Sequence, residues 1–284
     1  MNVFDSILLG LIQGLTEFIP ISSTAHLTLA GKLLGLVDSQ TAAAWTEFIA
    51  VIQMGTLTAV VLYFSRDVFT MAKAVLEDLR TRLAGNFSAA LSEHAKMGWL
   101  VTLGTVPVAV IGLLFSHEIH GWFTKSTTVI IFSLIVLAVL LWIAEKVARH
   151  ARVMEQISPG DAVIIGSAQA LALVPGSSRS GTTITAGLFL GLSRESAARF
   201  SFLLSVPAVF ASGVYELMKI QGDVTQFGYG NIVIATVVAG ASGYAAISWL
   251  LKYLSRNSTM VFVWYRLALG LILALFLHFG LIQP

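Results

Sequence analysis

The stretch PISSTAH, Pro20 to His26, interrupts an apolar region that runs from about residue 4 to residue 35. A related stretch, PGSSRSG at 175–181, interrupts a second apolar region at 161–192. Each interruption leaves apolar pieces of roughly 12 to 15 residues, shorter than the about 20 residues that a membrane-crossing helix needs. Non-helical backbone at membrane depth is tolerated where protein or a wet cavity satisfies its polar groups. The sequence therefore predicts two re-entrant hairpins, 4–35 and 161–192, each made of two half-helices.

The composition is that of a membrane protein. Hydrophobic residues make up 56% of the 284 residues and charged residues 11%, far below the charged share of about 25% in soluble domains. The net charge of +2 rests on few ionisable groups, and no basic patch with interleaved aromatic residues indicates a nucleic-acid partner. The absence of cysteine excludes disulfides and thiolate metal sites. Residues 1–5 do not resemble a signal peptide.

Six further apolar stretches are long enough to cross a membrane. They lie at about 45–64, 97–116, 127–145, 198–219, 229–251 and 261–281. The polar connection 65–96 between the first two predicts an interfacial helix followed by a loop at Gly85 and Asn86. The predicted fold class is an all-α integral membrane protein, one membrane domain over 1–284 with six full transmembrane helices and the two re-entrant hairpins.

The chain also indicates an internal duplication. The segment QGLTEFIPISSTAHL (13–27) resembles QALALVPGSSRSGT (169–182) when the two are aligned on the proline, and three full spans follow each hairpin. We therefore expect a first repeat at 1–150 and a second at 151–284. An odd number of crossings between the repeats inverts the second relative to the first, as in other membrane proteins with broken helices.

Lysine and arginine predict the orientation. One side of the membrane would carry most of the cations and the other side three lysines. The first group is Arg66, Lys73, Arg80, Arg82, Lys96, Lys146, Arg149, Arg152, Arg194, Arg199, Lys252 and Arg256, and the second is Lys32, Lys125 and Lys219. By the positive-inside rule the first group is cytoplasmic. Both termini then lie on the outer side of the membrane, and the two hairpins enter from opposite faces with converging tips.

The first hairpin carries residues that could act in catalysis. Gln13 and Glu17 are spaced i,i+4 and share a helix face. A carboxylate at membrane depth indicates a functional site, the alternative being a solvated carboxylate near the interface. Ser23 and His26, three residues apart, could serve as nucleophile and proton-transfer partner.

Ser22, Ser23 and Thr24 are natural N-caps for the helix that follows Pro20. A capped helix start offers free N–H groups and a positive dipole end to an anion. The alternative interpretation of the three hydroxyl residues is a helix cap without any role in chemistry.

The second hairpin has the composition of an oxyanion site. Glycine allows a tight concave backbone, hydroxyls add donors, and Arg179 supplies a planar fork suited to phosphate oxygens. The residues concerned are Gly176, Ser177, Ser178, Arg179, Ser180 and Thr183. No lysine follows the last glycine, so this is not a Walker A loop. Snorkelling of Arg179 to the surface is the alternative, and Arg266 in the last span is expected to snorkel or to pair structurally.

Together the two tips predict a pocket for an anion, most simply a phosphate or a pyrophosphate. Glu17 would repel such a ligand unless a divalent cation lies between them. We therefore expect Mg²⁺, or Ca²⁺ in second place, with Glu17 and Gln13 at the metal. The long apolar walls suit a ligand whose tail stays in the lipid.

At these residues the sequence resembles the undecaprenyl pyrophosphate phosphatases, a bacitracin-resistance family of membrane enzymes. The resemblance covers essentially the whole chain and rests on three segments, Gln13–Glu17 with Pro20–His26, Pro175–Thr183, and RFSFLLSVP at 199–207. Gln13 departs from the many relatives that carry Glu there, which leaves Glu17 as the single carboxylate for a metal.

The resemblance implies hydrolysis of undecaprenyl pyrophosphate to undecaprenyl phosphate and phosphate with a divalent cation. This reaction recycles the lipid carrier for peptidoglycan synthesis and confers bacitracin resistance. The resemblance also implies a multi-pass protein of the bacterial inner membrane with a pocket open to the periplasm. Ser23 is the favoured nucleophile, with His26 as the alternative, and Glu17 holds the metal or orients His26. Around the phosphate, Arg179 with Ser178, Ser180 and Thr183 would neutralise the transition state.

Two other functions fit parts of the pattern. Inverted repeats with broken helices also build secondary transporters, so a flippase for a lipid phosphate or another carrier of an anion is the main alternative. An ion channel is disfavoured because the polar groups are mixed and do not form repeated rings. The oligomeric state, monomer or homodimer, and the chain-length specificity are left open by the sequence.

Overall fold

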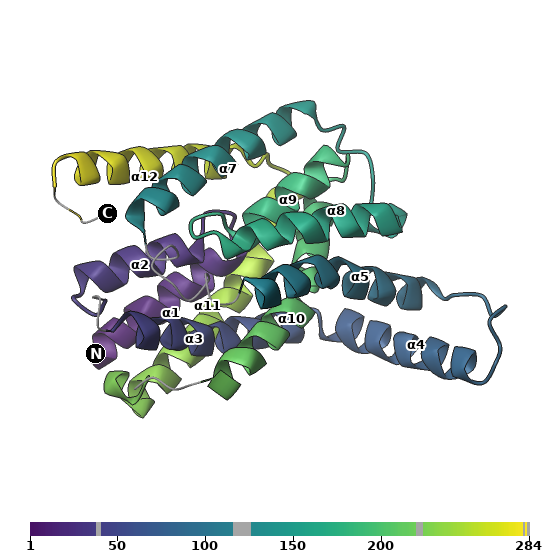
Figure 1. The fold of residues 1–284 in the computed structure, drawn as a ribbon. Helices are drawn as coiled ribbons and strands as arrows, with labels where there is room; N and C mark the ends of the chain where they lie inside the picture. The colour runs from purple at the N-terminus through teal and green to yellow at the C-terminus, as the bar shows by residue number, and fades with distance from the viewer. Residues whose placement is uncertain (38–40, 116–125, 220–223, 281, 283–284) are drawn as a thin grey trace.

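The computed structural model describes residues 1–37, 41–115, 126–219, 224–280 and 282 (Figure 1). Its regular secondary structure over these residues is entirely helical, and a single isolated bridge pairs Arg152 with Leu192. The predicted all-α class is therefore confirmed. Lys125, which the orientation argument uses, lies outside the described residues.

Six of the described helices are long and apolar enough to cross a membrane. They are α3 (Ala42–Tyr63), α5 (Glu93–Leu114), α7 (Thr127–Val147), α10 (Arg194–Lys219), α11 (Tyr229–Leu254) and α12 (Met260–His278). Each overlaps one of the six predicted stretches, with ends that differ by a few residues. The chain is a multi-pass membrane protein.

Four shorter helices form the two predicted hairpin regions. The first region contains α1 (Val3–Phe18) and α2 (Ser23–Leu33). The second contains α8 (Pro159–Ala170), the 3-10 turn η3 (Leu171–Leu173) and α9 (Arg179–Phe189). In Figure 1 the α1–α2 pair extends from the side of the N-terminus and the α8–α9 pair from the opposite side, and their connecting segments meet between them.

The two pairs have the same sequence of helix caps. Capping boxes start α1 at Asn2 and α8 at Ser158, and each box has aspartate three residues later. Asn2 and Ser158 are 156 residues apart. The N-cap residues of the second helices, Ser22 and Ser178, are separated by the same interval. Each pair closes on a glycine of positive φ after its second helix, Gly35 and Gly191.

The N-cap serines of α2 and α9 correct the predicted register between the two segments. Ser22 and Ser178 both have positive φ, 77° and 69°, a conformation that serine rarely adopts. Aligning the segments on these caps puts Gln13 opposite Gln169, whereas aligning them on the prolines shifts the two glutamines by one position. The N-cap serine, and not the proline, is therefore the structurally equivalent residue.

Small residues allow the hairpin helices to approach the long helices closely. A Cβ added to Gly166 of α8 would lie 2.0 Å from the Gly104 carbonyl oxygen of α5. A Cβ added to Gly10 of α1 would lie 2.5 Å from the Ala235 carbonyl oxygen of α11. Backbone contact of this kind is characteristic of helix packing in membranes, where van der Waals contact replaces hydrophobic exclusion of water. Each hairpin thus packs on a long helix from the other half of the chain.

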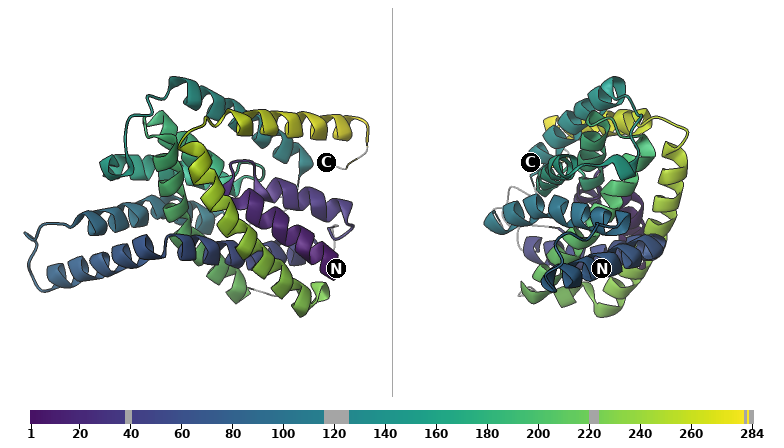
Figure 2. Two further views of the ribbon diagram at one scale, coloured as in Figure 1. Left: turned by 180° about the vertical axis from the view of Figure 1, so that it is seen from behind. Right: turned by 90° about the vertical axis from the view of Figure 1, so that its right-hand side faces the viewer.

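The polar connection after α3 forms a helix, α4 (Ser65–Leu83), which packs beside the first half of α5. The two helices project from the rest of the molecule, on the side away from both termini (Figure 2). Asp78 joins them, accepting hydrogen bonds from Arg82 at 2.9 Å and from the Trp99 indole at 2.9 Å. These bonds, Arg82 first, lower the pKa of the Asp78 carboxyl. Gly85 makes the turn with a φ of 86°, so the predicted helix and loop are both present.

The close contact between α5 and α8 generates a stability prediction. Gly166→Ala should lower the free energy of unfolding by about 1–3 kcal/mol, because the added methyl group has to displace backbone atoms of Gly104. Gly160→Ala in the same helix is the control, since its added Cβ meets its nearest atom at 3.8 Å. Thermal unfolding of the two variants in detergent measures the difference. Equal melting temperatures for Gly166→Ala and the wild type would show that the helices can separate freely.

Candidate functional site

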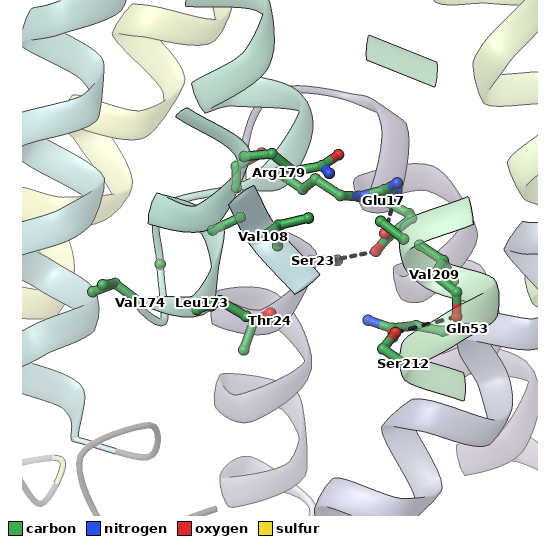
Figure 3. A pocket seen from close by; sticks show the side chains of 15 residues that line it. Glu17, Ser23, Thr24, Gln53, Val108, Leu173, Val174, Arg179, Val209 and Ser212 are labelled. Carbon is green, nitrogen blue, oxygen red and sulfur yellow. Dashed lines mark hydrogen bonds and ion pairs between the residues drawn. The ribbon is translucent and has the colours of Figure 1, made fainter. Parts of the chain in front are cut away.

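A cavity of about 180 Å³ lies where the two helix breaks meet (Figure 3). Its walls come from both hairpins and from three long helices. The residues that line it are Glu17, Ser23, Thr24, Gln53, Val108, Gln169, Ala172, Leu173, Val174, Gly176, Ser178, Arg179, Ala208, Val209 and Ser212. The lining is therefore mixed, with polar side chains from both hairpins and from α3 and α10 beside apolar ones.

Glu17 is the centre of the polar group. Its Oε1 accepts a hydrogen bond from Arg179 Nη2 at 2.8 Å, and its Oε2 accepts from Ser23 Oγ at 2.7 Å and from Gln13 Nε2 at 3.1 Å. The carboxylate is only 6% exposed, and a buried carboxylate requires such charged and hydrogen-bonding partners. Figure 3 shows Arg179 and Ser23 reaching Glu17 from two different helices.

Helix caps place two of the three partners of Glu17, Ser23 and Arg179. The Ser22 hydroxyl accepts from the Ala25 amide and starts α2 at Ser23. The Ser178 hydroxyl accepts from the Gly181 amide and starts α9 at Arg179. Ser23 and Arg179 are therefore the first residues of their helices, where the N–H groups lack acceptors within the helix. The positive ends of two helix dipoles face one cavity, which favours an anion there.

The sequence spacing suggests His26 as the proton-transfer partner of Ser23, but in the structure the Ser23 hydroxyl donates its hydrogen bond to Glu17. His26 Nδ1 lies 2.7 Å from the Ser22 carbonyl oxygen, and Nε2 lies 2.6 Å from the Tyr265 hydroxyl. The His26 ring also stacks on the Tyr265 ring, with centroids 5.6 Å apart. His26 is not among the residues that line the cavity, and its ring contacts α12 through Tyr265.

The other predicted residues fall into two groups. Thr24, Gly176 and Ser178 line the cavity, and the Ser178 hydroxyl lies 3.2 Å from that of Ser180. The remaining residues support the backbone of the hairpins. Ser22 caps α2, the Ser177 carbonyl oxygen accepts from Arg266, and Thr183 is buried, with its hydroxyl 2.6 Å from that of Ser201.

Arg266 joins the two breaks and does not reach the surface. The side chain is 1% exposed, so snorkelling is excluded and structural pairing, the second expectation, is confirmed. Its guanidinium donates to five carbonyl oxygens, those of Pro20, Ser133, Leu134, Gly176 and Ser177, at 3.0–3.3 Å. Three of these carbonyls belong to the connecting segments of the hairpins, which have left the helical hydrogen-bonding pattern.

Several buried polar atoms at the site have no hydrogen-bond partner in the described part of the chain. They are Arg179 Nη1, Gln13 Oε1 and both amide atoms of Gln169. Buried polar groups are nearly always paired in folded proteins, and exceptions call for an explanation. Two unpaired donors and two unpaired acceptors at or next to one cavity indicate that a polar ligand completes the site.

Three polar residues of the cavity, Gln53, Gln169 and Ser212, were not among the predicted site residues. Gln169 could have been found, because it takes the place of Gln13 once the two segments are aligned on their N-cap serines. Gln53 lies in an uninterrupted apolar span and has no motif around it, so only the fold brings it to the cavity.

This fold and site define a multi-pass helical membrane protein with a partly polar cavity where two helix breaks meet. The chain belongs to the family described as bacitracin resistance protein BacA, whose family model matches residues 6–272.

Curated relatives match over almost their full length. The undecaprenyl-diphosphatase of Syntrophobacter fumaroxidans is 52% identical over 95% of both chains. The undecaprenyl-diphosphatase of Chloroherpeton thalassium is 47% identical over 100% of this chain and 99% of the relative. A third, from Pseudarthrobacter chlorophenolicus, is 46% identical over 100% of both chains. The predicted family is confirmed.

The Arg266 contacts generate a prediction about folding. Arg266→Met should lower the free energy of unfolding by on the order of 3–5 kcal/mol, because several buried carbonyls lose a charged donor at once. Arg266→Lys should recover a part of this loss, since an ammonium has fewer donors and cannot span both breaks. Arg256→Met, at an exposed position after α11, is the matched control. Melting in detergent checks the order of the variants, and an Arg266→Met protein as stable as the control would contradict it.

Proposed function

We propose that this protein hydrolyses undecaprenyl pyrophosphate to undecaprenyl phosphate and inorganic phosphate. The observation that carries the proposal is the meeting of Glu17, Ser23 and Arg179, from three helices, in one buried cavity. The Ser23 hydroxyl donates a hydrogen bond to the Glu17 carboxylate, and the Arg179 guanidinium lies beside them at a helix N-terminus. A nucleophile, a base and a cation in this arrangement suit an enzyme that transfers a phosphoryl group. The names of the curated relatives give the same activity.

Substrate binding would exchange one partner of Arg179 for another. Its Nη1 is unpaired and its Nη2 holds Glu17. Glu17 offers Arg179 a single oxygen, because its other oxygen accepts from Ser23 and Gln13. The terminal phosphate can accept two hydrogen bonds from the guanidinium and is therefore the stronger acceptor. The amides at the starts of α2 and α9 supply further donors. The isoprenyl tail would leave along the apolar walls, which include Val108, Ala208 and Val209.

In the chemical step the Ser23 oxygen attacks the terminal phosphorus of the pyrophosphate. The Ser23 proton passes to Glu17, to which the hydroxyl already donates. The bond from the terminal phosphorus to the bridging oxygen breaks, and that oxygen leaves with its electron pair on undecaprenyl phosphate. Water then attacks the phosphoserine, and the serine oxygen leaves with its electron pair and takes back the proton that Glu17 received. The ionised Glu17 accepts one proton from the attacking water, and release of that proton to solvent restores the base. Arg179 stabilises the charge on the transferred group in both steps.

Glu17 is the base in this mechanism, a role for which the sequence favours His26. Both ring nitrogens of His26 already have partners, the Ser22 carbonyl and the Tyr265 hydroxyl. His26 would act on the reaction through the backbone, because its bond to Ser22 fixes the start of the helix that carries Ser23. A catalytic role of its own for His26 stays a prediction.

The residues at the cavity fit a divalent cation that is shared with the substrate. No three acidic or histidine side chains of the described residues lie close enough together to hold a metal by themselves. Mg²⁺, however, commonly takes one or two carboxylates and completes its shell with substrate phosphates and water. Glu17 and the unpaired Gln13 Oε1 would hold it. Such a cation would neutralise the charge of the pyrophosphate next to Glu17. Ca²⁺ is the second candidate.

The membrane arrangement that supports this reaction is an inverted repeat. We place the α1–α2 and α8–α9 pairs as re-entrant hairpins that enter from opposite faces, in agreement with the opposed directions in Figure 1. The projecting α4–α5 end carries many of the cations that the positive-inside rule assigns to the cytoplasm. Both termini then face the periplasm of a bacterial inner membrane, and the cavity opens to that side. The product would return to peptidoglycan synthesis, and this recycling would confer resistance to bacitracin.

A carrier for a lipid phosphate is the second candidate function. Broken helices that direct two N-termini at a buried anion site also occur in secondary transporters. The Ser23–Glu17 hydrogen bond favours the enzyme, because a carrier requires no activated hydroxyl. Detergent separates the two functions, since solubilised protein has no compartments between which to transport a substrate.

The hydrolysis is tested with purified protein in detergent and farnesyl pyrophosphate as a short-chain substrate. The wild type should release phosphate, and EDTA should abolish the release until Mg²⁺ is restored. Ser23→Ala and Arg179→Ala should each reduce kcat/KM by at least about 100-fold, because each removes a group that acts on the transition state. Ser255→Ala and Arg256→Ala, remote from the cavity, are the matched controls.

Each outcome of this assay has a separate meaning. Full activity of Ser23→Ala would refute the serine nucleophile. Wild-type rates for Arg179→Ala would refute the pocket as the reaction site. No release by the wild type in varied detergents and cations would leave the carrier as the better proposal.

The orientation is tested by single cysteines, since the chain contains none. Gln226→Cys, in η4 (Val224–Phe227) before α11, should react with a membrane-impermeant maleimide added to spheroplasts. Asn86→Cys, in the turn between α4 and α5, should react only after the membrane is opened. Both side chains are exposed in the structure. The reverse pattern would invert the proposed topology, and it would leave the proposed chemistry untouched.

A further inference from the structure

Gln169 is a buried polar residue that lines the cavity. It is 1% exposed, yet neither its Nε2 nor its Oε1 has a hydrogen-bond partner in the described part of the chain. The side chain lines the cavity together with Arg179. A buried amide with both ends unpaired destabilises a folded protein, so a group that the protein keeps in this state needs a partner from outside the chain.

Comparison with Gln13 shows why Gln169 has no internal partner. The two residues occupy the same position relative to the N-cap serines of their hairpins. Gln13 Nε2 donates to Glu17 one helical turn later. The residue one turn after Gln169 is Leu173, which has no acceptor. The Gln13 amide therefore has a partner within the protein, whereas the equivalent residue, Gln169, lines the cavity with its amide unpaired.

The surroundings of Gln169 favour a donor role over a metal-binding role. A hard cation prefers oxygen ligands. The first hairpin offers two of them, the Glu17 carboxylate and the unpaired Gln13 amide oxygen. The second hairpin supplies Arg179 and the hydroxyl of Ser178 to the cavity. Gln169 belongs to this second, electropositive half, where phosphate oxygens would gather.

We propose that Gln169 is a substrate-binding residue whose Nε2 donates a hydrogen bond to a phosphate oxygen of the pyrophosphate. The bond fixes the phosphate beside Arg179 and so sets the position of the terminal phosphorus relative to the Ser23 oxygen. A neutral donor adds a directional contact without a further charge, which complements the charged fork of Arg179. This inference rests on the proposed phosphatase function.

The test uses the intact protein in detergent with farnesyl pyrophosphate, and it combines kinetics with stability. Gln169→Leu keeps the approximate volume and removes the amide, so kcat/KM should fall about 10- to 100-fold, the range of one hydrogen bond to a charged acceptor. Its melting temperature without substrate should equal or exceed that of the wild type, because the variant no longer buries an unpaired amide. A substitution that merely damaged the fold would lower both quantities.

Gln169→Glu separates a donor to phosphate from a ligand of a cation. The carboxylate keeps the shape, loses the donor and repels the phosphate, so this variant should be less active than Gln169→Leu. Gln226→Leu, an exposed glutamine in η4 exchanged in the same way, is the matched control and should keep the wild-type kinetics.

Several results would overturn the inference. Gln169→Leu with wild-type kcat/KM would show that solvent in the cavity, and not the substrate, satisfies the amide. A lower melting temperature together with lower activity would reassign Gln169 to the fold. Higher activity of Gln169→Glu than of Gln169→Leu would place the side chain at the cation. Failure of the phosphatase proposal is recognised separately, because then the wild type itself releases no phosphate.

Discussion

The need to pair backbone carbonyls where two helices break is the constraint on which this structure depends. The connecting segments at Pro20 and at Gly176–Ser177 leave helical geometry among apolar helices, where unpaired carbonyls are costly. Arg266 meets this need with one planar group that donates to both segments and to α7. A lysine could not contact as many oxygens in fixed directions. One buried cation thereby holds together two breaks that lie far apart in the sequence.

Holding the breaks together also creates the site. Each break ends in an N-cap serine, and the residue after each cap projects into the common cavity, Ser23 from α2 and Arg179 from α9. Glu17 binds both and so links the two hairpins. The Arg266 guanidinium donates to backbone carbonyl oxygens and does not line the cavity. Arg179 lines the cavity, and its Nη1 has no hydrogen-bond partner in the described part of the chain. The buried Arg266 and the partly buried Arg179 thus have separate roles at the same segments, Arg266 in folding and Arg179 in the binding that we propose.

Much of this arrangement could be predicted from the sequence. The six long helices follow from length and hydrophobicity, and the interruptions by Pro20 and Pro175 indicate where the helices break. Glu17, Ser23 and Arg179 stand out because they are polar where their neighbours are apolar. The partner of His26 could not be predicted, because Tyr265 lies in another helix near the end of the chain. Gln169 was not predicted for a different reason. The sequence alignment of the two segments rests on their prolines, whereas the N-cap serines, which the sequence alone does not distinguish from their neighbouring serines, set the structural register.

The two hairpins show how one scaffold can acquire two complementary halves. Their caps and closing glycines match, but the residues that face the cavity differ. Glu17 in the first hairpin corresponds to Leu173 in the second, and Ser23 corresponds to Arg179. A symmetrical pair of carboxylates would repel a phosphate, and a symmetrical pair of arginines would leave no base for a serine. The difference at these two positions allows one half to hold the nucleophile and its base while the other half binds the anion. Equal backbones and unequal side chains are therefore both required by the chemistry that we propose for this cavity.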